Sequence, residues 1–288
     1  MPFISSLTGS FFAGRRANAF GVPWDPSTAI TPAVWLDASD TGSYTLSGST
    51  LTAITDKAGN ATMTVGGTPI RNSGDLNSLN TFTFDGSNEY LQSSNEFAQV
   101  DGSGNHWAIG VFQWNTVDST QDSFWSTENN TVSATSKRDY AISSGNASSW
   151  PGELDLDGLS SNRISTTIGN KQDFSTSVSQ NTWTIVASNF NKTGNQISCR
   201  LNGANAFTPV NDYDNALNTN QDIRLMRNRA SQELAGKLAE FFSVAAPPGT
   251  GSTDISTLEK AEGYLAWKWG LEGNLPSDHP YKNSAPTE

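Results

Sequence analysis

The segment Trp107-Ala-Ile-Gly-Val-Phe-Gln-Trp114 decides how this chain folds. Large apolar residues alternate with other side chains along it, as at Trp107, Ile109 and Val111. Successive side chains of a β-strand point to opposite faces, so a period of two residues predicts a strand over 107–114.

Segments of similar character recur along most of the sequence. Clusters of Gly, Asn, Asp and Ser separate them at intervals of roughly ten residues, as turns between strands would. No helical pattern is interleaved with them, which argues against a parallel sheet with crossover helices. The sequence therefore predicts an all-β fold, a two-sheet antiparallel jelly-roll sandwich. The other predicted strands are 34–38, 50–54, 61–65, 81–84, 89–92, 122–126, 139–143, 153–157, 164–168, 182–188, 197–201, 222–226 and 238–244.

One helix is predicted near the C-terminus, over 256–269. Ser256-Thr-Leu-Glu259 reads as a capping box, in which the Ser hydroxyl and the Glu carboxylate satisfy free amide groups of the first turn. Gly270 suits the C-terminal cap. A single apolar face holds Leu258, Ala261, Leu265 and Trp269.

Composition excludes several classes of protein. The chain has 288 residues, a net charge of −11 and only 35% hydrophobic residues. No apolar run is long enough to span a membrane, so we expect no membrane insertion. Nine Trp, fourteen Phe and six Tyr provide a core and argue against disorder. The acidic balance argues against nucleic acid as a partner, because no basic stripe is present to neutralise phosphates.

Cysteine and histidine are too few for the common metal sites. Cys199 is the one cysteine and lies in an alternating segment, so we expect a buried strand residue rather than a nucleophile. His106 and His279 are the only histidines. We therefore expect no metal and no cofactor.

Residues 1–31 differ from the rest and are predicted to form an extended N-terminal arm ahead of a domain at 32–288. The arm shows no sustained period, and its first 24 residues contain two arginines and no acid. Large apolar groups in such a segment favour docking on another surface, although a floppy terminus is the alternative. The candidate anchoring residues are Phe3, Ile4, Phe11, Phe12, Arg15 and Arg16.

Three segments resemble a known group of domains. They are Thr83-Phe-Asp-Gly-Ser-Asn-Glu-Tyr-Leu91, Leu238-Ala-Glu-Phe-Phe-Ser-Val244, and Glu262-Gly-Tyr-Leu-Ala-Trp-Lys-Trp-Gly-Leu271 with Leu275-Pro and His279-Pro-Tyr281. All three are similar to motifs of laminin-G-like, concanavalin A-like jelly rolls, and the last is similar to the ending of structural proteins of marine tailed phages. Residues 1–16 also resemble the N-termini of such virion proteins.

This resemblance implies a non-enzymatic structural protein located in the virion. It would decorate the capsid or form part of a neck or tail appendage, held by its N-terminal arm. Its implied partners are other virion proteins, with the chain present as a homo-oligomer or in many copies.

A glycan-binding module for attachment to a host surface is the alternative. Trp125 and Trp150 lie near polar stretches and are the candidate contacts for sugar rings, although ordinary packing is the competing interpretation. Trp35, Trp107, Trp183, Trp267 and Trp269 are expected in the core or under the helix.

Two acidic segments suggest further chemistry. Glu153-Leu-Asp-Leu-Asp157 places three carboxylates on one strand face, similar to the catalytic strand of retaining β-glucanases, so Glu153 and Asp157 define an endoglycosidase hypothesis. A solvent-facing acidic edge is the simpler interpretation. Asp101-Gly-Ser-Gly-Asn105 spaces oxygen ligands like the start of a weak calcium loop, or is a plain hairpin turn.

Overall fold

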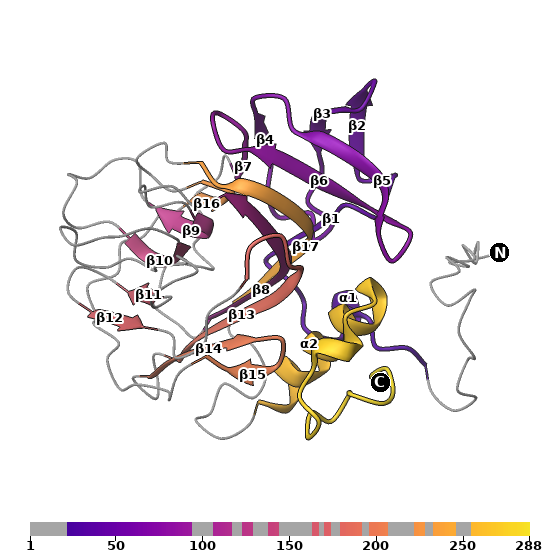
Figure 1. Ribbon diagram of the computed structural model, residues 1–288, viewed down its shortest axis with the longest axis vertical. Coiled ribbons are helices and arrows are strands. Elements are labelled where there is room, and N and C mark those ends of the chain that lie inside the picture. The colour runs from indigo at the N-terminus through magenta and orange to yellow at the C-terminus, as the bar shows by residue number, and fades with distance from the viewer. Residues whose placement is uncertain are drawn as a thin grey trace.

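The computed structural model describes part of the chain. Its described residues are 22–93, 106–116, 123–128, 138–143, 163–166, 170–173, 179–191, 196–206, 222–227, 233–245 and 255–288. Within them the chain forms two antiparallel β-sheets, two α-helices and one 3-10 helix (Figure 1). This confirms the predicted all-β sandwich with a C-terminal helix.

The larger sheet contains ten of the described strands. Its order is β15-β14-β13-β8-β17-β6-β5-β3-β2, and β1 pairs with β17. The strands are β1 (Val34–Asp37), β2 (Tyr44–Ser47), β3 (Thr50–Ile54), β5 (Ile70–Leu76), β6 (Leu79–Asp85), β8 (His106–Thr116), β13 (Thr184–Asn191), β14 (Gln196–Leu201), β15 (Ala204–Asn205) and β17 (Ala235–Ala245).

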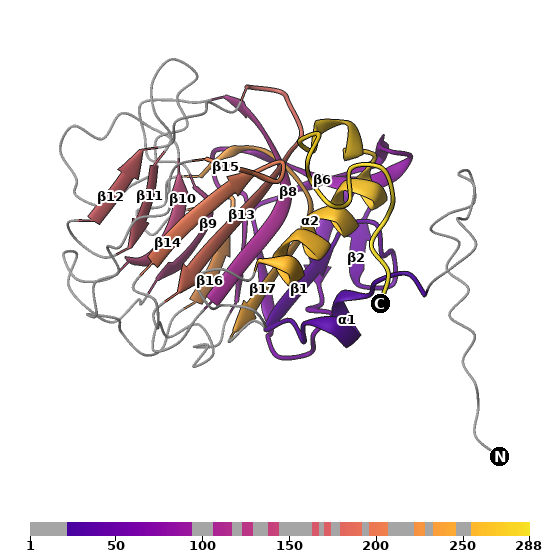
Figure 2. The same ribbon diagram turned by 90° about the horizontal axis from the view of Figure 1, so that it is seen from below.

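The smaller sheet contains seven of the described strands and lies behind the larger one in Figure 2. Its order is β12-β11-β10-β9-β16-β7-β4. The strands are β4 (Met63–Gly66), β7 (Tyr90–Ser93), β9 (Ser123–Glu128), β10 (Arg138–Ser143), β11 (Arg163–Thr166), β12 (Asn170–Asp173) and β16 (Asp222–Leu225).

A first apolar core fills the space between the sheets. Phe112 of β8 lies 4.8 Å from Phe124 of β9, and Trp125 of β9 lies 6.3 Å from Phe241 of β17, measured between ring centroids. Burial of large aromatic side chains from both sheets is the main stabilising term of such a sandwich.

A second apolar core covers the outer face of the larger sheet, where helix α2 (Ser256–Trp269) packs (Figure 2). Trp107, Ile109 and Val111 of β8 face this core, whereas Ala108, Phe112 and Trp114 face the other sheet. The alternation in 107–114 therefore reflects a central strand that is covered on both faces. The helix contributes Leu258, Ala261, Leu265, Ala266 and Trp269.

An irregularity in β17 sets which of its side chains face the helix. The register between β17 and β8 shifts between Leu238 and Glu240. Leu238 and Phe241 face the core between the sheets, while Ala239 and Phe242 face the helix-covered core. Because a bulge turns an extra residue toward one face, Glu240 lies on the side of α2 rather than between the sheets.

The two ends of α2 differ in how well they match the sequence prediction. Gly270 has φ +73° and forms the predicted left-handed C-terminal cap. The predicted capping box is wrong, because Ile255 occupies the N-cap and Ser256 is already the first helical residue. The Glu259 carboxylate lies 3.6 Å from the Arg200 guanidinium.

Residues 22–31, which fall within the predicted arm, pack against the domain. Asp25 caps the short helix α1 (Pro26–Ala29) by accepting a hydrogen bond of 2.8 Å from the amide of Ser27. Trp24 and Ile30 are buried in the helix-covered core. Pro23 pairs with Thr287 in an isolated bridge, so this segment lies beside the C-terminal residues.

Four strands, β2, β5, β12 and β15, were not anticipated from the sequence, and one predicted strand lies outside the described residues. The β5 strand is polar and carries Gly74 with φ +65°, so it lacks an alternating apolar pattern. The strand predicted at 164–168 ends at Thr166. The strand predicted at 153–157 lies outside the described residues.

Candidate functional site

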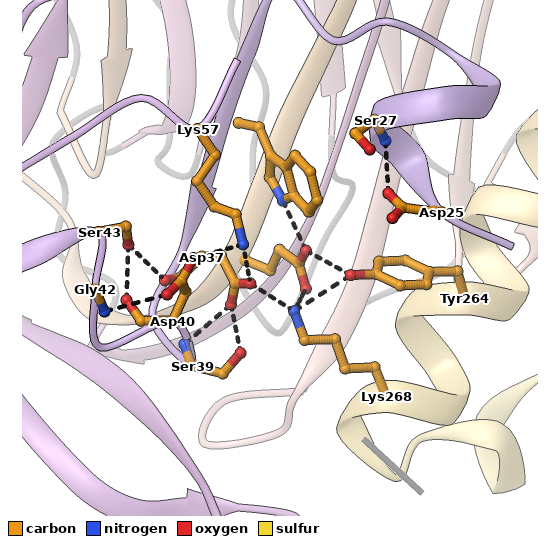
Figure 3. Close-up of polar contacts among 12 residues, drawn as sticks. Asp25, Ser27, Asp37, Ser39, Asp40, Gly42, Ser43, Lys57, Tyr264 and Lys268 are labelled. Carbon is orange, nitrogen blue, oxygen red and sulfur yellow. Dashed lines mark hydrogen bonds and ion pairs between the residues drawn. The ribbon is translucent and has the colours of Figure 1, made fainter. Parts of the chain in front are cut away.

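A buried cluster of charged groups joins α2 to the larger sheet. Lys268 Nζ lies 2.8 Å from Asp37 Oδ2 and 2.7 Å from Glu240 Oε2. These three side chains are at most 4% exposed. Asp37 and Glu240 are register partners on the adjacent strands β1 and β17, so Lys268 reaches both carboxylates from the helix above them. Figure 3 shows the side chains of Asp37 and Lys268 converging.

Aromatic side chains supply the remaining partners of Glu240. Its Oε1 accepts hydrogen bonds from Trp35 Nε1 at 2.8 Å and from the Tyr264 hydroxyl at 3.1 Å. Its Oε2 also accepts one from Trp269 Nε1 at 2.8 Å. A buried carboxylate is tolerated only where its oxygens are paired in this way. Burial nevertheless raises the pKa of Glu240, and Asp37 adds to that effect.

The carboxylate of Asp37 is held from its other side as well. Its Oδ1 accepts hydrogen bonds from the backbone amide and the hydroxyl of Ser39, at 3.0 and 2.6 Å. Lys57 Nζ lies 3.1 Å from Asp37 Oδ2 and 2.8 Å from Asp40 Oδ2. Burial acts to raise the pKa of Asp37, but Lys268 and Lys57 outweigh it and lower that pKa to about 2.

A second buried ionic group lies further along the same helix. The guanidinium of Arg200 on β14 donates to both oxygens of Glu262, and it also donates to the carbonyl of Gly203 at 2.5 Å. His279 Nε2 lies 3.1 Å from Glu262 Oε2. The residues of the C-terminal motif therefore fasten the helix and the following segment to the sheet.

The motif at 83–91 stabilises a turn. Glu89 Oε2 accepts a hydrogen bond of 2.7 Å from the amide of Asp85, and Oε1 accepts one of 3.2 Å from the Thr68 hydroxyl. Gly86 has φ +77° and would clash with Ala235 if it carried a Cβ. This motif therefore has a structural role at the turn after β6.

A row of polar side chains crosses the outer face of the smaller sheet. Thr64 of β4 is in register with Gln92 of β7, Gln92 with Arg224 of β16, and Arg224 with Ser126 of β9. Their strand neighbours Val65, Leu91, Leu225 and Trp125 belong to the core between the sheets, so the polar row faces away from it. Gln92 also donates a hydrogen bond of 2.8 Å to Asp222.

An aromatic ring lies beside this row, at Tyr90, two residues from Gln92 on β7 and in register with Gly66. The guanidinium carbon of Arg227 lies 4.1 Å from the ring centroid of Tyr90, and Arg227 pairs with Glu233 at 3.2 Å. A Cβ at Gly66 would lie only 2.2 Å from Tyr90 Cε1, so the absence of a side chain there lets the ring lie on the sheet. We call Thr64, Tyr90, Gln92 and Arg227 the polar face. Along the row, the solvent exposure of the residues falls from the exposed Thr64 to the buried Arg224 and Ser126.

The structure tests only some of the residues proposed from the sequence. Trp125 is 1% exposed and lies between the sheets, which corrects its assignment as a sugar contact. Cys199 is buried as predicted, and burial raises the pKa of its thiol. The other candidates lie outside the described residues: Phe3, Ile4, Phe11, Phe12, Arg15, Arg16, Asp101–Asn105, Trp150, Glu153 and Asp157.

The other tryptophans assigned to the core or to the space under the helix are buried or partly buried. Trp35, Trp107 and Trp269 are buried, which confirms the prediction for them. Trp183 is partly buried against the helix-covered core. The indole of Trp267 donates a hydrogen bond of 2.8 Å to the carbonyl of Tyr281.

The described part of the chain contains no group of three or more His, Cys, Asp or Glu side chains placed to hold a metal ion. No helix within it has the length and apolar character needed to cross a membrane.

Sequence reasoning missed Asp37, Lys268 and the polar face. Asp37 follows three apolar residues in a predicted strand, and Lys268 lies between two tryptophans in the predicted helix. A charge inside an otherwise apolar segment is the one signal that points to such buried pairs. The polar face carries no comparable signal, because register between strands far apart in sequence creates it.

Comparison with known proteins finds similarity in fold alone. No family model matches the chain, and no curated protein matches it in sequence. Among solved structures, domain 4 of AbnA, a GH43 extracellular arabinanase from Geobacillus stearothermophilus in complex with arabinotriose, is 12% identical with a TM-score of 0.50. The match covers 76% of this chain and 94% of that domain.

Two further similar structures are larger proteins. A Trypanosoma rangeli sialidase in complex with the inhibitor DANA is 11% identical with a TM-score of 0.53, over 83% of this chain and 35% of that one. Botulinum neurotoxin type C, whose cell entry depends on interaction with two ganglioside molecules, is 13% identical with a TM-score of 0.52, over 81% and 51%. The chain therefore spans about a third to a half of their length, and it shares with all three a β-sandwich fold.

Proposed function

We propose that this protein is a non-enzymatic module that binds glycans through the polar face of its smaller sheet. The observation that carries the proposal is the row of hydroxyl, amide and guanidinium groups beside the Tyr90 ring. Sugar rings offer hydroxyl groups for hydrogen bonds and apolar faces for aromatic contact. A site with a few fixed polar groups beside an aromatic ring suits such a ligand.

The comparisons support this proposal indirectly. The arabinanase domain was solved with arabinotriose, and the neurotoxin interacts with gangliosides. Those ligands belong to those proteins, and a shared fold does not transfer them. The polar face of this chain is the feature that makes the same class of ligand our proposal here.

A glycan array with the whole chain tests the proposal. We expect binding that Tyr90→Ala weakens strongly and that Gly66→Ala also weakens, because an alanine Cβ would lift the Tyr90 ring from the sheet. Thr52→Ala, at an exposed site on β3 of the larger sheet, is the matched control and should bind like the parent. The absence of binding at millimolar sugar, with correctly folded protein, would exclude this function.

A structural role in a tailed-phage virion is the second candidate function. It is compatible with the first, because a glycan-binding module could be carried on the virion. This structural role is supported by the resemblance of residues 262–281 to the ending of tailed-phage structural proteins, by the resemblance of residues 1–16 to the N-termini of virion proteins, and by the apolar, basic character of 1–21. We propose that this arm fixes multiple copies to a capsid, neck or tail protein and that the protein is located in the virion.

Deleting residues 1–21 tests the arm. The deletion stops there because Trp24 is 4% exposed and belongs to the core. We expect the shortened chain to fold, as judged by its thermal unfolding, and to be lost from particles. Incorporation equal to that of the full chain would rule out anchoring by the arm.

The absence of catalysis is part of the same proposal. Glu153 and Asp157 remain the candidate pair for an endoglycosidase. We expect no release of reducing sugar from laminarin or host-surface glycan by the full chain. Activity that Glu153→Gln abolishes would replace the binding proposal with an enzymatic one.

A further inference from the structure

The buried cluster brings together one amine, of Lys268, and two carboxyl groups, of Asp37 and Glu240. Lys268 Nζ is 2.8 Å from Asp37 Oδ2, and the carboxylate of Glu240 is 2.7 Å from the same nitrogen. An amine, a carboxyl and a second carboxyl to move the proton are the components that a self-catalysed condensation needs. Their side chains are held by a strand pair and a helix, so they are aligned without further ordering.

We propose that Lys268 and Asp37 become joined by an intramolecular isopeptide bond, with Glu240 as the catalytic proton carrier. The site thereby becomes a covalent link between helix α2 and strand β1. This inference is independent of the proposed glycan-binding function, because the two sites lie on different sheets.

The reaction balances as a loss of one water. Glu240 takes a proton from the Lys268 ammonium and passes it to Asp37 Oδ2, and the freed amine attacks Cγ of the resulting carboxylic acid. The C–N bond forms, and the C–Oδ2 bond then breaks. Oδ2 leaves as water, carrying the proton returned by Glu240 and the second proton lost from the nitrogen. An ion pair is thus converted to a neutral amide plus water, with no oxidant or further reactant.

The surroundings of Asp37 favour the charged intermediate of this reaction. Negative charge that develops on Oδ1, the oxygen that stays in the amide, faces the amide and hydroxyl of Ser39 at 3.0 and 2.6 Å. Lys57 Nζ lies 3.1 Å from the departing Oδ2. Fixed donors aimed at a developing oxyanion lower the barrier to attack on a carboxyl carbon. The lysine nitrogen also lies 5.5 and 5.3 Å from the ring centroids of Tyr264 and Trp269.

Glu240 is suited to the role of proton carrier. Burial raises its pKa, which favours acceptance of a proton from the neighbouring ammonium. The carboxylate cannot turn away, because Trp35, Tyr264 and Trp269 all donate hydrogen bonds to it.

The link would close a very long loop, since its two ends are 231 residues apart in sequence. A covalent closure of this size removes conformational entropy from the unfolded chain and stabilises the native state, as a disulfide does. With Cys199 as its one cysteine, this chain has no disulfide within itself that does the same.

Peptide mapping of the purified full chain tests the proposal. Trypsin acting on an unlinked chain releases residues 17–57 and 261–268 as separate peptides. The bond blocks cleavage after Lys268, so we expect 17–57 joined to 261–282, with the summed mass lowered by one water. Fragmentation of that species should place the link between Asp37 and Lys268.

Two variants distinguish the proposed bond from other reactions that lower the mass by one water. Glu240→Gln retains the shape of the side chain but accepts no proton, and Lys268→Arg retains the charge without a primary amine; neither should form the linked peptide. Lys237→Arg, at a lysine that pairs with Asp75 outside the cluster, is the matched control and should retain it. Ring closure at Asp85-Gly86 also loses water, but it leaves the two peptides separate.

The wild-type digest decides the question even if a variant fails to fold. Release of unmodified 261–268 and 17–57 from folded wild-type protein would overturn the proposal. A bond from Asp37 to Lys57 instead of Lys268, or a bond from Lys268 to Glu240 in the peptide 238–260, would overturn the assignment of Asp37 and Lys268 as the linked pair.

Discussion

Arg200 on strand β14 and Glu262 on helix α2 form a buried, two-pronged ion pair. Arg200 Nε lies 2.7 Å from Glu262 Oε1, and Arg200 Nη2 lies 3.0 Å from Glu262 Oε2. The carboxylate is fully buried and the guanidinium is 8% exposed. Burial acts to lower the pKa of Arg200, but Glu262 outweighs it and raises that pKa, so the arginine remains charged. The pair fixes the position of α2 along the sheet.

Removal of Glu262 should therefore be costly. Glu262→Ala leaves the buried Arg200 charge with only the more distant Glu259 carboxylate, at 3.6 Å, and we expect a loss of about 3–5 kcal/mol in the free energy of unfolding. Urea unfolding followed by tryptophan fluorescence measures it. The control is Asp75→Ala, which breaks the more exposed pair with Lys237 at 3.0 Å and should cost less than about 1 kcal/mol. Equal losses in both variants would contradict the importance of the buried pair.

Gly270 is required at the end of α2 by its backbone conformation. Its φ of +73° is unfavourable for a residue with a Cβ, which would also meet Asn77 at about 3.2 Å. Gly270→Ala should lower the free energy of unfolding by about 1–2 kcal/mol. Gly273→Ala, where a Cβ meets nothing within 4 Å, is the matched control and should change it by less than about 0.5 kcal/mol. Thermal unfolding of the two variants compares them directly.

The thiol of Cys199 should be unreactive in the folded protein. Burial raises its pKa above the ordinary value, so the nucleophilic thiolate is scarcer than in an exposed cysteine at every pH near neutrality. We expect no labelling by iodoacetamide under native conditions and complete labelling in urea. Rapid native labelling, without loss of structure, would show that the residue is accessible and would revive the hypothesis of a nucleophile.

Trp24 should contribute to stability although it lies within the predicted arm, residues 1–31. Its ring is 4% exposed and lies 5.6 Å from the ring of Tyr264 on α2. Trp24→Ala should cost about 3–5 kcal/mol in the free energy of unfolding, as for other large core aromatics. Val22→Ala, at a side chain that is 65% exposed, should leave stability unchanged. A neutral Trp24→Ala would place the start of the domain after residue 24.

The sequence by itself determined the fold class and the position of the long helix. Alternation in 107–114 and repeated turn residues specify strands because side-chain direction along a strand depends only on local backbone geometry. The apolar face of α2 and the glycine at its end are equally local signals. Where the local pattern was weak, as in the polar strand β5, or misleading, as in the capping box at Ser256, the prediction failed.

The burial of Trp125 and the charged clusters depended on contacts between distant segments. Trp125 looked exposed because polar residues surround it in sequence, yet its strand places it opposite Phe241 of the other sheet. Glu240 reaches the helix only because a bulge turns it away from the core between the sheets. Asp37 and Lys268 meet across 231 residues of chain. No local pattern encodes such a meeting, because strand register and helix docking bring these groups together, and the low dielectric of the interior then makes their pairing obligatory.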